Sequence, residues 1–269
     1  MKSKYDWTND FAKLWGNFKP PVRPSRYDLA VLREYLDKKI KKKGKKVRVL
    51  ILGSTPEFRD VVLRRKLVPY VVDYHKDNYI AMGTLRKYKG KEIHIHQDWR
   101  KLKLKEKFDL VFAEASLNML KKKEVPVVLK RVNSLLEEDG LFLSKTWLKT
   151  EKKLTMDYII KLYRKKYRHM KFKFAMSNLN YSFSCGKGTS VNTKKEFFRM
   201  KKLYEKGILT KAEFDSYCNL GYEVSNLDIF MPLKKWFDST ARKYMKIKKI
   251  IYPKPIGPSK MPIYVLGKK

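Results

Sequence analysis

Three acidic residues of this chain each follow a stretch of strand-like composition. They are Asp73 after 69–72, Asp98 after 92–97 and Glu114 after 108–113. Because parallel strands of an α/β sheet end at the same edge, the three carboxylates are expected on one rim of a sheet. A carboxylate there can accept hydrogen bonds from hydroxyl or amine groups and can take up a proton. In a chain with a formal net charge of +37, three acids on one rim are hard to explain by chance.

The segment before the first of these acids has the pattern of a strand, a tight turn and a capped helix. The apolar strand 47–52 runs into Gly53, which lets the backbone turn without a β-carbon in the way. Ser54 and Glu57 stand at the spacing of a capping box, and Pro56 suits a first helical turn, so Ser54 is expected to cap the next helix. Such a turn, followed twenty positions after its glycine by a carboxylate, is the layout of a nucleotide-type cofactor site.

The residues after Gly53 distinguish between two cofactor classes. A dinucleotide site needs further glycines, so that pyrophosphate can approach the backbone. Here Ser54, Thr55 and Glu57 occupy the turn instead. A carboxylate such as that of Glu57 would repel pyrophosphate, whereas it would attract a sulfonium or an α-ammonium group. The turn therefore favours S-adenosylmethionine over a nicotinamide cofactor, and a nicotinamide-dependent oxidoreductase is kept as a third hypothesis.

The elements that must position these residues alternate between strands and helices. Strands are expected at 47–52, 69–74, 92–97, 108–113 and 141–147, and helices at 28–42 and near 56–66, 77–88 and 125–137. Nearly continuous apolar strands that alternate with helices are typical of a parallel sheet covered on both faces. Two last strands, at 245–252 and 261–266, are expected to form an antiparallel hairpin at the sheet edge. The predicted fold class is α/β, with a Rossmann-like, mostly parallel sheet and a helical insertion.

The insertion, residues 151–244, differs in character from the rest of the chain. Basic helical stretches are expected at 154–169, 194–206, 210–219 and 232–244, with a polar, glycine-bearing loop at 177–192. Thr210 and Glu213 have the spacing of a capping box. The predicted organisation has three parts: an N-terminal lid or helical segment at 1–44, a cofactor-binding domain made of 45–150 and 245–269, and the basic insertion at 151–244, which shapes the acceptor site.

The motifs resemble those of the class I S-adenosylmethionine-dependent methyltransferases. The resemblance is good over about residues 45–148 and looser over 245–266. Residues 49–57, Val-Leu-Ile-Leu-Gly-Ser-Thr-Pro-Glu, look like the variant first motif of one branch of this family, in which Thr-Pro-Glu replaces the usual later glycines. The resemblance implies a Rossmann-like fold and methyl transfer by direct displacement, with S-adenosylmethionine as the cofactor.

The resemblance also implies roles for the candidate site residues. The cofactor-binding set is Gly53, Ser54, Thr55 and Glu57 at the methionine part, Asp73 at the ribose, Asp98 and Trp99 at the adenine, Glu114 beside the methyl group, and Tyr74 as a further contact. Glu114 is also the expected catalytic residue, as a base or an orienter of the acceptor. The N-terminal segment with Trp15 and Arg26 is expected to fold over the site as a lid.

Absent motifs narrow the acceptor only in part. Neither the Asp/Asn-Pro-Pro-Tyr motif of nucleobase amine methylation nor the Pro-Cys nucleophile of cytosine carbon-5 methylation is present. Lys145 stands where RNA ribose 2′-O-methyltransferases carry a catalytic lysine, but Glu114 replaces their aspartate and 261–266 contains no glutamate. Lys145 is therefore predicted to be a surface lysine at a strand end. A small molecule and RNA remain alternative acceptors.

The net charge of +37 has two interpretations. It would attract a polyanion such as nucleic acid. However, only 14 of the 64 lysine and arginine residues are arginine, and the lysines are spread along the chain, as genome composition or a thermophilic surface would also produce. The alternative to an enzyme is a non-catalytic nucleic-acid-binding protein on a methyltransferase fold.

Other features favour a cytoplasmic protein without a metal or membrane partner. No apolar run is long enough to span a bilayer, and the first residues lack the apolar core of a signal peptide. Cys185 and Cys218 have neither disulfide nor zinc spacing. His94 and His96 alternate along one predicted strand without an evident third ligand, so a structural role is expected for both.

Overall fold

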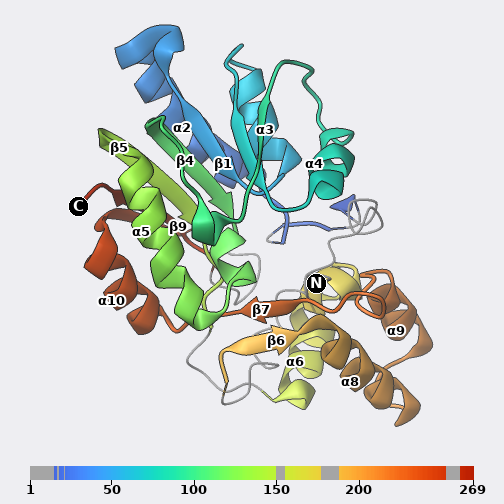
Figure 1. The fold of residues 1–269 in the computed structure, drawn as a ribbon. Coiled ribbons are helices and arrows are strands. Elements are labelled where there is room, and N and C mark those ends of the chain that lie inside the picture. The colour runs from blue at the N-terminus through green and yellow to red at the C-terminus, as the bar shows by residue number, and fades with distance from the viewer. Residues whose placement is uncertain (1–14, 17, 21, 150–154, 177–187, 253–260) are drawn as a thin grey trace.

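A seven-stranded sheet forms the centre of the molecule (Figure 1). The computed structural model describes residues 15–16, 18–20, 22–149, 155–176, 188–252 and 261–269. In the sheet order β3-β2-β1-β4-β5-β9-β8, the strands are β1 (Val49–Leu52), β2 (Tyr70–Asp73), β3 (Ile93–His96), β4 (Phe108–Glu114), β5 (Leu136–Lys145), β8 (Lys246–Ile251) and β9 (Ile263–Gly267). β1 to β5 are parallel, and β9 is antiparallel to both of its neighbours. The predicted mostly parallel, Rossmann-like sheet with an antiparallel C-terminal hairpin is confirmed.

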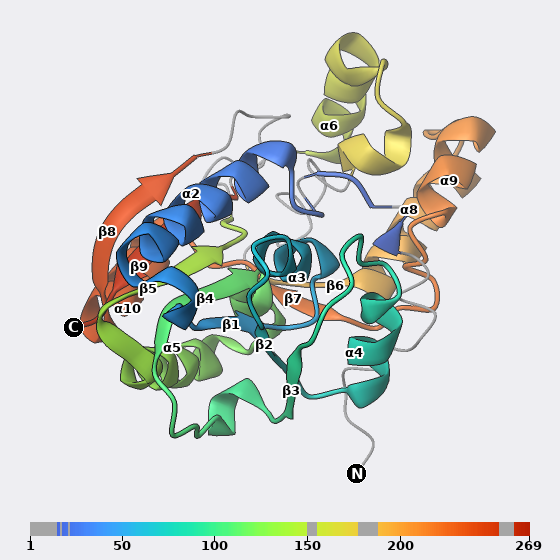
Figure 2. The same ribbon diagram turned by 90° about the horizontal axis from the view of Figure 1, so that it is seen from above.

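Helices cover both faces of this sheet (Figure 2). They are α2 (Arg26–Lys43) and α3 (Pro56–Leu63) on one face, and α5 (Val125–Leu135) and α10 (Lys234–Tyr244) on the other. Because successive side chains of a strand point to opposite faces, Ile51 packs with α2 and α3, whereas Leu50 packs with α5 and α10. All four residues of β1 are buried, which explains the continuous apolar run in the sequence.

A third group of elements lies beyond the ends toward which the parallel strands point (Figure 1). It contains α6 (Met156–Leu162), a π-helical turn (Tyr163–Tyr167), α8 (Thr193–Glu205), α9 (Lys211–Cys218) and the antiparallel pair β6 (Ser190–Asn192) and β7 (Asp228–Phe230). Its apolar core includes Trp15 and Phe18 from the N-terminal segment and Trp147 from the chain after β5. The N-terminal segment and the inserted segment therefore share one core.

Several element boundaries differ from those expected. α4 (Lys76–Gly83) ends five residues before 88, and β5 begins at Leu136, because Leu136 pairs with Phe108 of β4. In the expected loop 177–192, residues 190–192 form β6, and residues 177–187 with Cys185 lie outside the described ranges. The capping box of Thr210 and Glu213 is confirmed by hydrogen bonds in both directions.

No helix in the described ranges is long and apolar enough to cross a membrane.

Candidate active site

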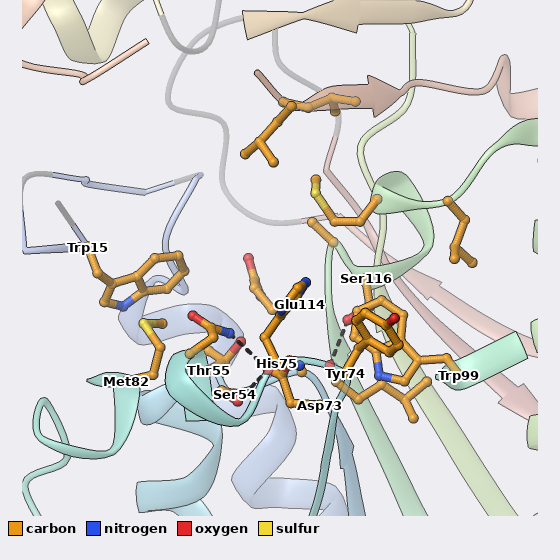
Figure 3. Close-up of a pocket in the computed structure, with 18 of the residues that line it drawn as sticks. Trp15, Ser54, Thr55, Asp73, Tyr74, His75, Met82, Trp99, Glu114 and Ser116 are labelled. Carbon is orange, nitrogen blue, oxygen red and sulfur yellow. Dashed lines mark hydrogen bonds between the residues drawn. The ribbon is translucent and has the colours of Figure 1, made fainter. Parts of the chain in front are cut away.

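A cavity of about 600 Å³ lies at the carboxyl ends of β1, β2 and β4. Eight of the nine predicted cofactor residues line it: Gly53, Ser54, Thr55, Asp73, Tyr74, Asp98, Trp99 and Glu114. In Figure 3, Trp15 and Met82 lie on one side, Ser116 and Trp99 on the other, and Glu114 and Asp73 between them. The structure thus brings residues from four separate strand ends around one space. Glu57 is the member of the predicted set that does not line it.

The turn after β1 is shaped by Gly53 and Trp99. Gly53 has a φ of 92°, in the left-handed region that favours glycine, and its N–H donates to the carbonyl of Val72. The indole N–H of Trp99 donates to the same carbonyl, at 3.1 Å. A β-carbon on Gly53 would lie 3.5 Å from the Trp99 ring, so the ring covers the turn at contact distance. The turn and the end of β3 therefore form one continuous wall of the cavity.

Asp73 is buried at the end of β2 and held by three donors. It accepts hydrogen bonds from the backbone N–H of His75 at 3.0 Å, from the side-chain amide of Asn78 at 2.9 Å, and from the Ser54 hydroxyl. The predicted capping role of Ser54 is wrong, because its hydroxyl donates to this carboxylate, a charge-assisted bond, and Thr55 precedes α3 without a side-chain cap. Asn78 was not predicted from the sequence, and its side-chain amide is one of the three groups that fix the orientation of the Asp73 carboxylate.

Glu57 faces the N-terminal segment. Its carboxylate accepts from the indole N–H of Trp15, 3.3 Å from each oxygen, and from the Arg23 guanidinium. Trp15 lines the cavity as expected, whereas Arg26 is exposed and Arg23 makes the contact with the site. Both Trp15 and Arg23 belong to the segment before α2. Through these contacts Glu57 holds that segment beside the turn after β1.

Asp98 is tied to its neighbour Arg100. The Arg100 backbone N–H and Nε donate to Asp98 at 2.9 and 2.8 Å, and Arg100 Nη1 lies 2.7 Å from Glu124 Oε1. Burial acts to raise the pKa of Asp98, but the Arg100 hydrogen bonds outweigh it and lower that pKa below its ordinary value. Asp98 therefore stays an ionised acceptor at the rim of the cavity.

A buried ion-pair triad lies at the ends of β4 and β5. Lys145 is the register partner of Glu114, and its Nζ is 2.8 Å from Glu114 Oε1 and 3.0 Å from Asp28 Oδ2 of α2. Each of these side chains is 2% exposed. The prediction of Lys145 as a surface lysine is wrong, because two buried carboxyl groups hold its ammonium inside. The capping-box spacing of Ser25 and Asp28 was a sequence signal for the start of α2, but not for this contact.

Glu114 has an altered acidity. Burial raises its pKa to about 8, against the opposing effect of Lys145, and the charge of Asp28 adds to the rise. The pKa of Lys145 is also raised, because Glu114 and Asp28 outweigh the burial that would lower it. Near neutral pH, Lys145 is thus charged, and Glu114 keeps its proton where an ordinary glutamate would have lost it. Glu114 Oε2 is buried and receives no hydrogen bond from the described residues.

The backbone after Glu114 is held in an uncommon conformation. Ala115 has a φ of 52°, which costs a residue with a β-carbon some free energy. Its N–H donates to the carbonyl of Lys145 at 2.9 Å, and the Ser116 hydroxyl donates to the carbonyl of Leu52 at 2.7 Å. The buried Asn118 amide donates to the carbonyls of Trp147 and Phe230. These bonds secure the turn that carries Glu114 to the two neighbouring strands and to β7.

The wall opposite the predicted cofactor residues is made of residues that, apart from Trp15, were not individually predicted at the site. Its apolar and aromatic lining is Trp15, Phe18, Val22, Met82, Met119, Trp147, Tyr222, Leu227 and Ile229. These residues come from the N-terminal segment, α4, the turn after β4, the chain after β5 and the inserted segment. No periodicity relates positions so far apart in the chain, and only the tertiary structure brings them together.

His94 and His96 of β3 contact neighbouring tyrosine residues. The His94 ring stacks on Tyr79 at a centroid distance of 3.8 Å, and His96 Nε2 lies 2.6 Å from the carbonyl of Tyr74. Among the described residues, no three His, Cys, Asp or Glu side chains are grouped as metal ligands.

Several solved structures share this fold. A crystal structure of an S-adenosylmethionine-dependent methyltransferase from Clostridium acetobutylicum ATCC 824 has 11% identity over 97% of this chain and 98% of that chain, with a TM-score of 0.56. The glycopeptide N-methyltransferase MtfA, in complex with S-adenosyl-L-homocysteine, has 10% identity over 88% of this chain and 89% of that chain, with a TM-score of 0.51. A crystal structure of putative Zn-dependent alcohol dehydrogenases from Rhodobacter sphaeroides has 14% identity over 97% of this chain and 99% of that chain, with a TM-score of 0.53. No family model matches the sequence, and no curated protein matches it.

The chain therefore has the Rossmann-like fold of the S-adenosylmethionine-dependent methyltransferases. At these identities the likeness is one of fold, so the chemistry must be argued from the site itself.

Proposed function

We propose that this protein is a methyltransferase that uses S-adenosylmethionine. The observation that carries the proposal is the charge of the cavity. Its described lining contains four carboxyl groups, one guanidinium and one imidazole, namely Asp73, Asp98, Glu114, Glu124, Arg100 and His75. S-adenosylmethionine has two cationic groups and one carboxylate, which suits such a lining, whereas a dinucleotide would bring a pyrophosphate to it.

The geometry supports a division of labour among the predicted residues. Asp73 retains acceptor capacity for ribose hydroxyls beyond its three present donors. Gly53 leaves the turn open, and the Trp99 ring beside it offers an apolar surface to a purine. Glu57 acts through Trp15 and Arg23 and does not touch the cofactor directly.

Glu114 would be the catalytic residue. When bound, S-adenosylmethionine would supply an electrophilic methyl carbon for bonding to an acceptor lone pair, with S-adenosylhomocysteine leaving and keeping the electron pair of the broken carbon–sulfur bond. Glu114 Oε2, buried and without a hydrogen-bond donor among the described residues, can orient an acceptor N–H or O–H and take its proton. Lys145 and Asp28 hold the Glu114 carboxyl at the end of β4. Much of the rate would come from alignment of the two reactants in the cavity.

Binding of S-adenosylhomocysteine, measured by calorimetry, tests the cofactor part of the proposal. Wild type should bind it, and Asp73→Ala should bind it about tenfold or more weakly, because a hydrogen bond to a charged group contributes about 1.5–3 kcal/mol. Asp77→Ala is the matched control, because Asp77 is an exposed acid on the next helix and does not line the cavity. Absence of binding to wild type would exclude the methyltransferase proposal, and an NAD titration of the same protein tests the oxidoreductase.

Transfer is tested by adding methyl-labelled S-adenosylmethionine to an extract of the source cell with wild type or Asp73→Ala. The products are then separated into nuclease-sensitive polymer, protein and small molecules. Label that enters one fraction with wild type and is absent with the variant would establish the enzyme and its acceptor class. The non-catalytic nucleic-acid-binding alternative instead expects RNA binding without any transfer of label.

A further inference from the structure

The part of the cavity beyond Glu114 has the composition of a pocket for an apolar molecule. Its walls carry Trp15, Phe18, Val22, Met119, Trp147, Tyr222, Leu227 and Ile229. Apolar and aromatic walls with few polar groups are typical of small-molecule sites, and the whole cavity, which an acceptor would share with the cofactor, has a volume of about 600 Å³. The aromatic rings give large contact areas without charge.

Cations are scarce in this cavity, although they dominate the chain. The sequence contains 50 lysines, yet none of the described lining residues is a lysine. Arg100 is the arginine of that lining, and Asp98 and Glu124 already occupy its guanidinium. A phosphate or carboxylate that entered the cavity would thus find no unpaired arginine or lysine among the described lining residues.

The described lining also includes the polar side chains of Thr193 and Glu114. Thr193 is already engaged, because its hydroxyl lies 3.0 Å from the carbonyl of Ser225 and accepts from the N–H of Leu227. Glu114 is engaged through Oε1, which lies 2.8 Å from Lys145 Nζ, but its Oε2 is buried and receives no hydrogen bond from the described residues. An acceptor would therefore meet a carboxyl group that can bind an N–H or O–H, whereas the described lining offers an anion no lysine and only the already paired Arg100.

We propose that the acceptor is an apolar small molecule, neutral or cationic, that presents an amine or hydroxyl group to Glu114, and that RNA and other polyanions are not acceptors. This inference rests on the proposed methyltransferase function, since it names the substrate class of the same site. The basic character of the chain then belongs to its outer surface and does not describe the substrate.

Three probes of equal shape and different charge test the proposal. Tyramine, 4-ethylphenol and 4-hydroxyphenylacetate share a phenol ring with a two-carbon side chain and are cationic, neutral and anionic. Each is titrated into the full chain saturated with S-adenosylhomocysteine. Tyramine and 4-ethylphenol should bind at millimolar concentration or better, and the anion about tenfold more weakly or not at all, since a carboxylate that loses its hydration without a lysine or arginine partner is disfavoured by about 1 kcal/mol or more.

Paired substitutions at one wall position make the test specific for charge. Met119, a half-buried lining residue, is changed to Lys or to Glu. Met119→Lys should strengthen binding of 4-hydroxyphenylacetate and weaken that of tyramine, whereas Met119→Glu should keep the wild-type order. Val127→Lys, which adds the same charge at an exposed position of α5, should change nothing. Thermal unfolding of each variant confirms that it is folded, and the wild-type comparison stands without the variants.

The outcomes separate this inference from the proposed function. If wild type fails to bind S-adenosylhomocysteine, the proposed function fails. If it binds S-adenosylhomocysteine, but the anion binds as tightly as the cation, or none of the three probes binds at millimolar concentration, the inference alone is overturned. Displacement of bound tyramine by a single-stranded RNA oligonucleotide would also overturn it.

Discussion

Glu114 is the residue whose environment sets the working pH. Because burial raises its pKa to about 8, the basic form required to accept a proton increases through that pH. We expect kcat/KM for methyl transfer to rise between about pH 6 and about pH 9, and Glu114→Gln to lower it about 10²-fold to 10⁴-fold and abolish the rise. A pH-rate profile of both proteins checks this. A rise retained in the variant would assign the titration to another group.

The same pKa affects stability, with a defined sign. The folded protein holds the Glu114 proton at pH values where the unfolded chain has lost it, so this group weakens folding as pH rises from its ordinary pKa of 4.5 to about 8. Glu114→Gln should therefore gain in melting temperature relative to wild type as the pH is raised through this window. Thermal unfolding at several pH values measures it. Glu138→Gln, at a side chain 91% exposed, should show no such gain above pH 5.

Lys145 links three secondary-structure elements, and its contribution to stability comes from holding them together. Its ammonium bridges Glu114 at the end of β4 and Asp28 at the start of α2 from its own position at the end of β5. Lys145→Met should lower the free energy of unfolding by about 3–5 kcal/mol, because two buried carboxyl groups lose their partner. The triple variant with Asp28→Asn and Glu114→Gln should recover much of that loss.

Urea denaturation of the single and triple variants measures both effects. Lys38→Met is the control, since Lys38 pairs with Glu34 on the exposed side of α2 and such pairs contribute about 0.5 kcal/mol or less. A single variant as stable as wild type would show that the triad does not hold these elements together.

The N-terminal segment is attached to α3 through one carboxylate. Glu57 binds both Trp15 and Arg23, so Glu57→Ala should release this segment while the rest of the sheet remains intact. We expect faster chymotrypsin cleavage after Trp15 and Phe18, which are buried in the wild type, and an affinity for S-adenosylhomocysteine about tenfold lower, because Trp15 lines the cavity. Glu106→Ala, at an exposed loop position, is the control. Equal cleavage rates in the two variants would exclude a role for Glu57 as the fastening point.

At the scale of the whole molecule, the net charge of +37 predicts polyanion binding on the outside. Single-stranded RNA should bind with an affinity that falls steeply with salt, with a slope of about 0.7 per phosphate neutralised. Saturation with S-adenosylhomocysteine should leave this affinity unchanged, because no described lining residue of the cavity is a lysine. Filter binding over a salt series, with and without S-adenosylhomocysteine, measures it. Mutual displacement of RNA and S-adenosylhomocysteine would instead place RNA in the cavity.

The fold and one wall of the site could be predicted from local patterns. Buried strands leave apolar runs before Asp73 and Glu114, the alternating strand β3 stands before Asp98, and parallel strands bring the residues after them to one edge. The roles of Ser54 and Lys145 were mistaken for one physical reason. A hydroxyl or ammonium bonds to whichever strong acceptor lies nearest in space, and Asp73 and Asp28 are distant in sequence.

By itself, the sequence determined the α/β class, the order of strands and helices of the main sheet, and the acids at its carboxyl edge, because hydrophobic periodicity and turn chemistry act over a few residues. Only the tertiary structure decided that Lys145 is buried between Glu114 and Asp28, that Glu57 holds the N-terminal segment, and that the far wall of the cavity is apolar. Those features depend on which distant side chains meet when the sheet, the N-terminal segment and the insertion pack together. Burial and pairing then set the charge and acidity of each group, and neither can be read from its neighbours in the chain.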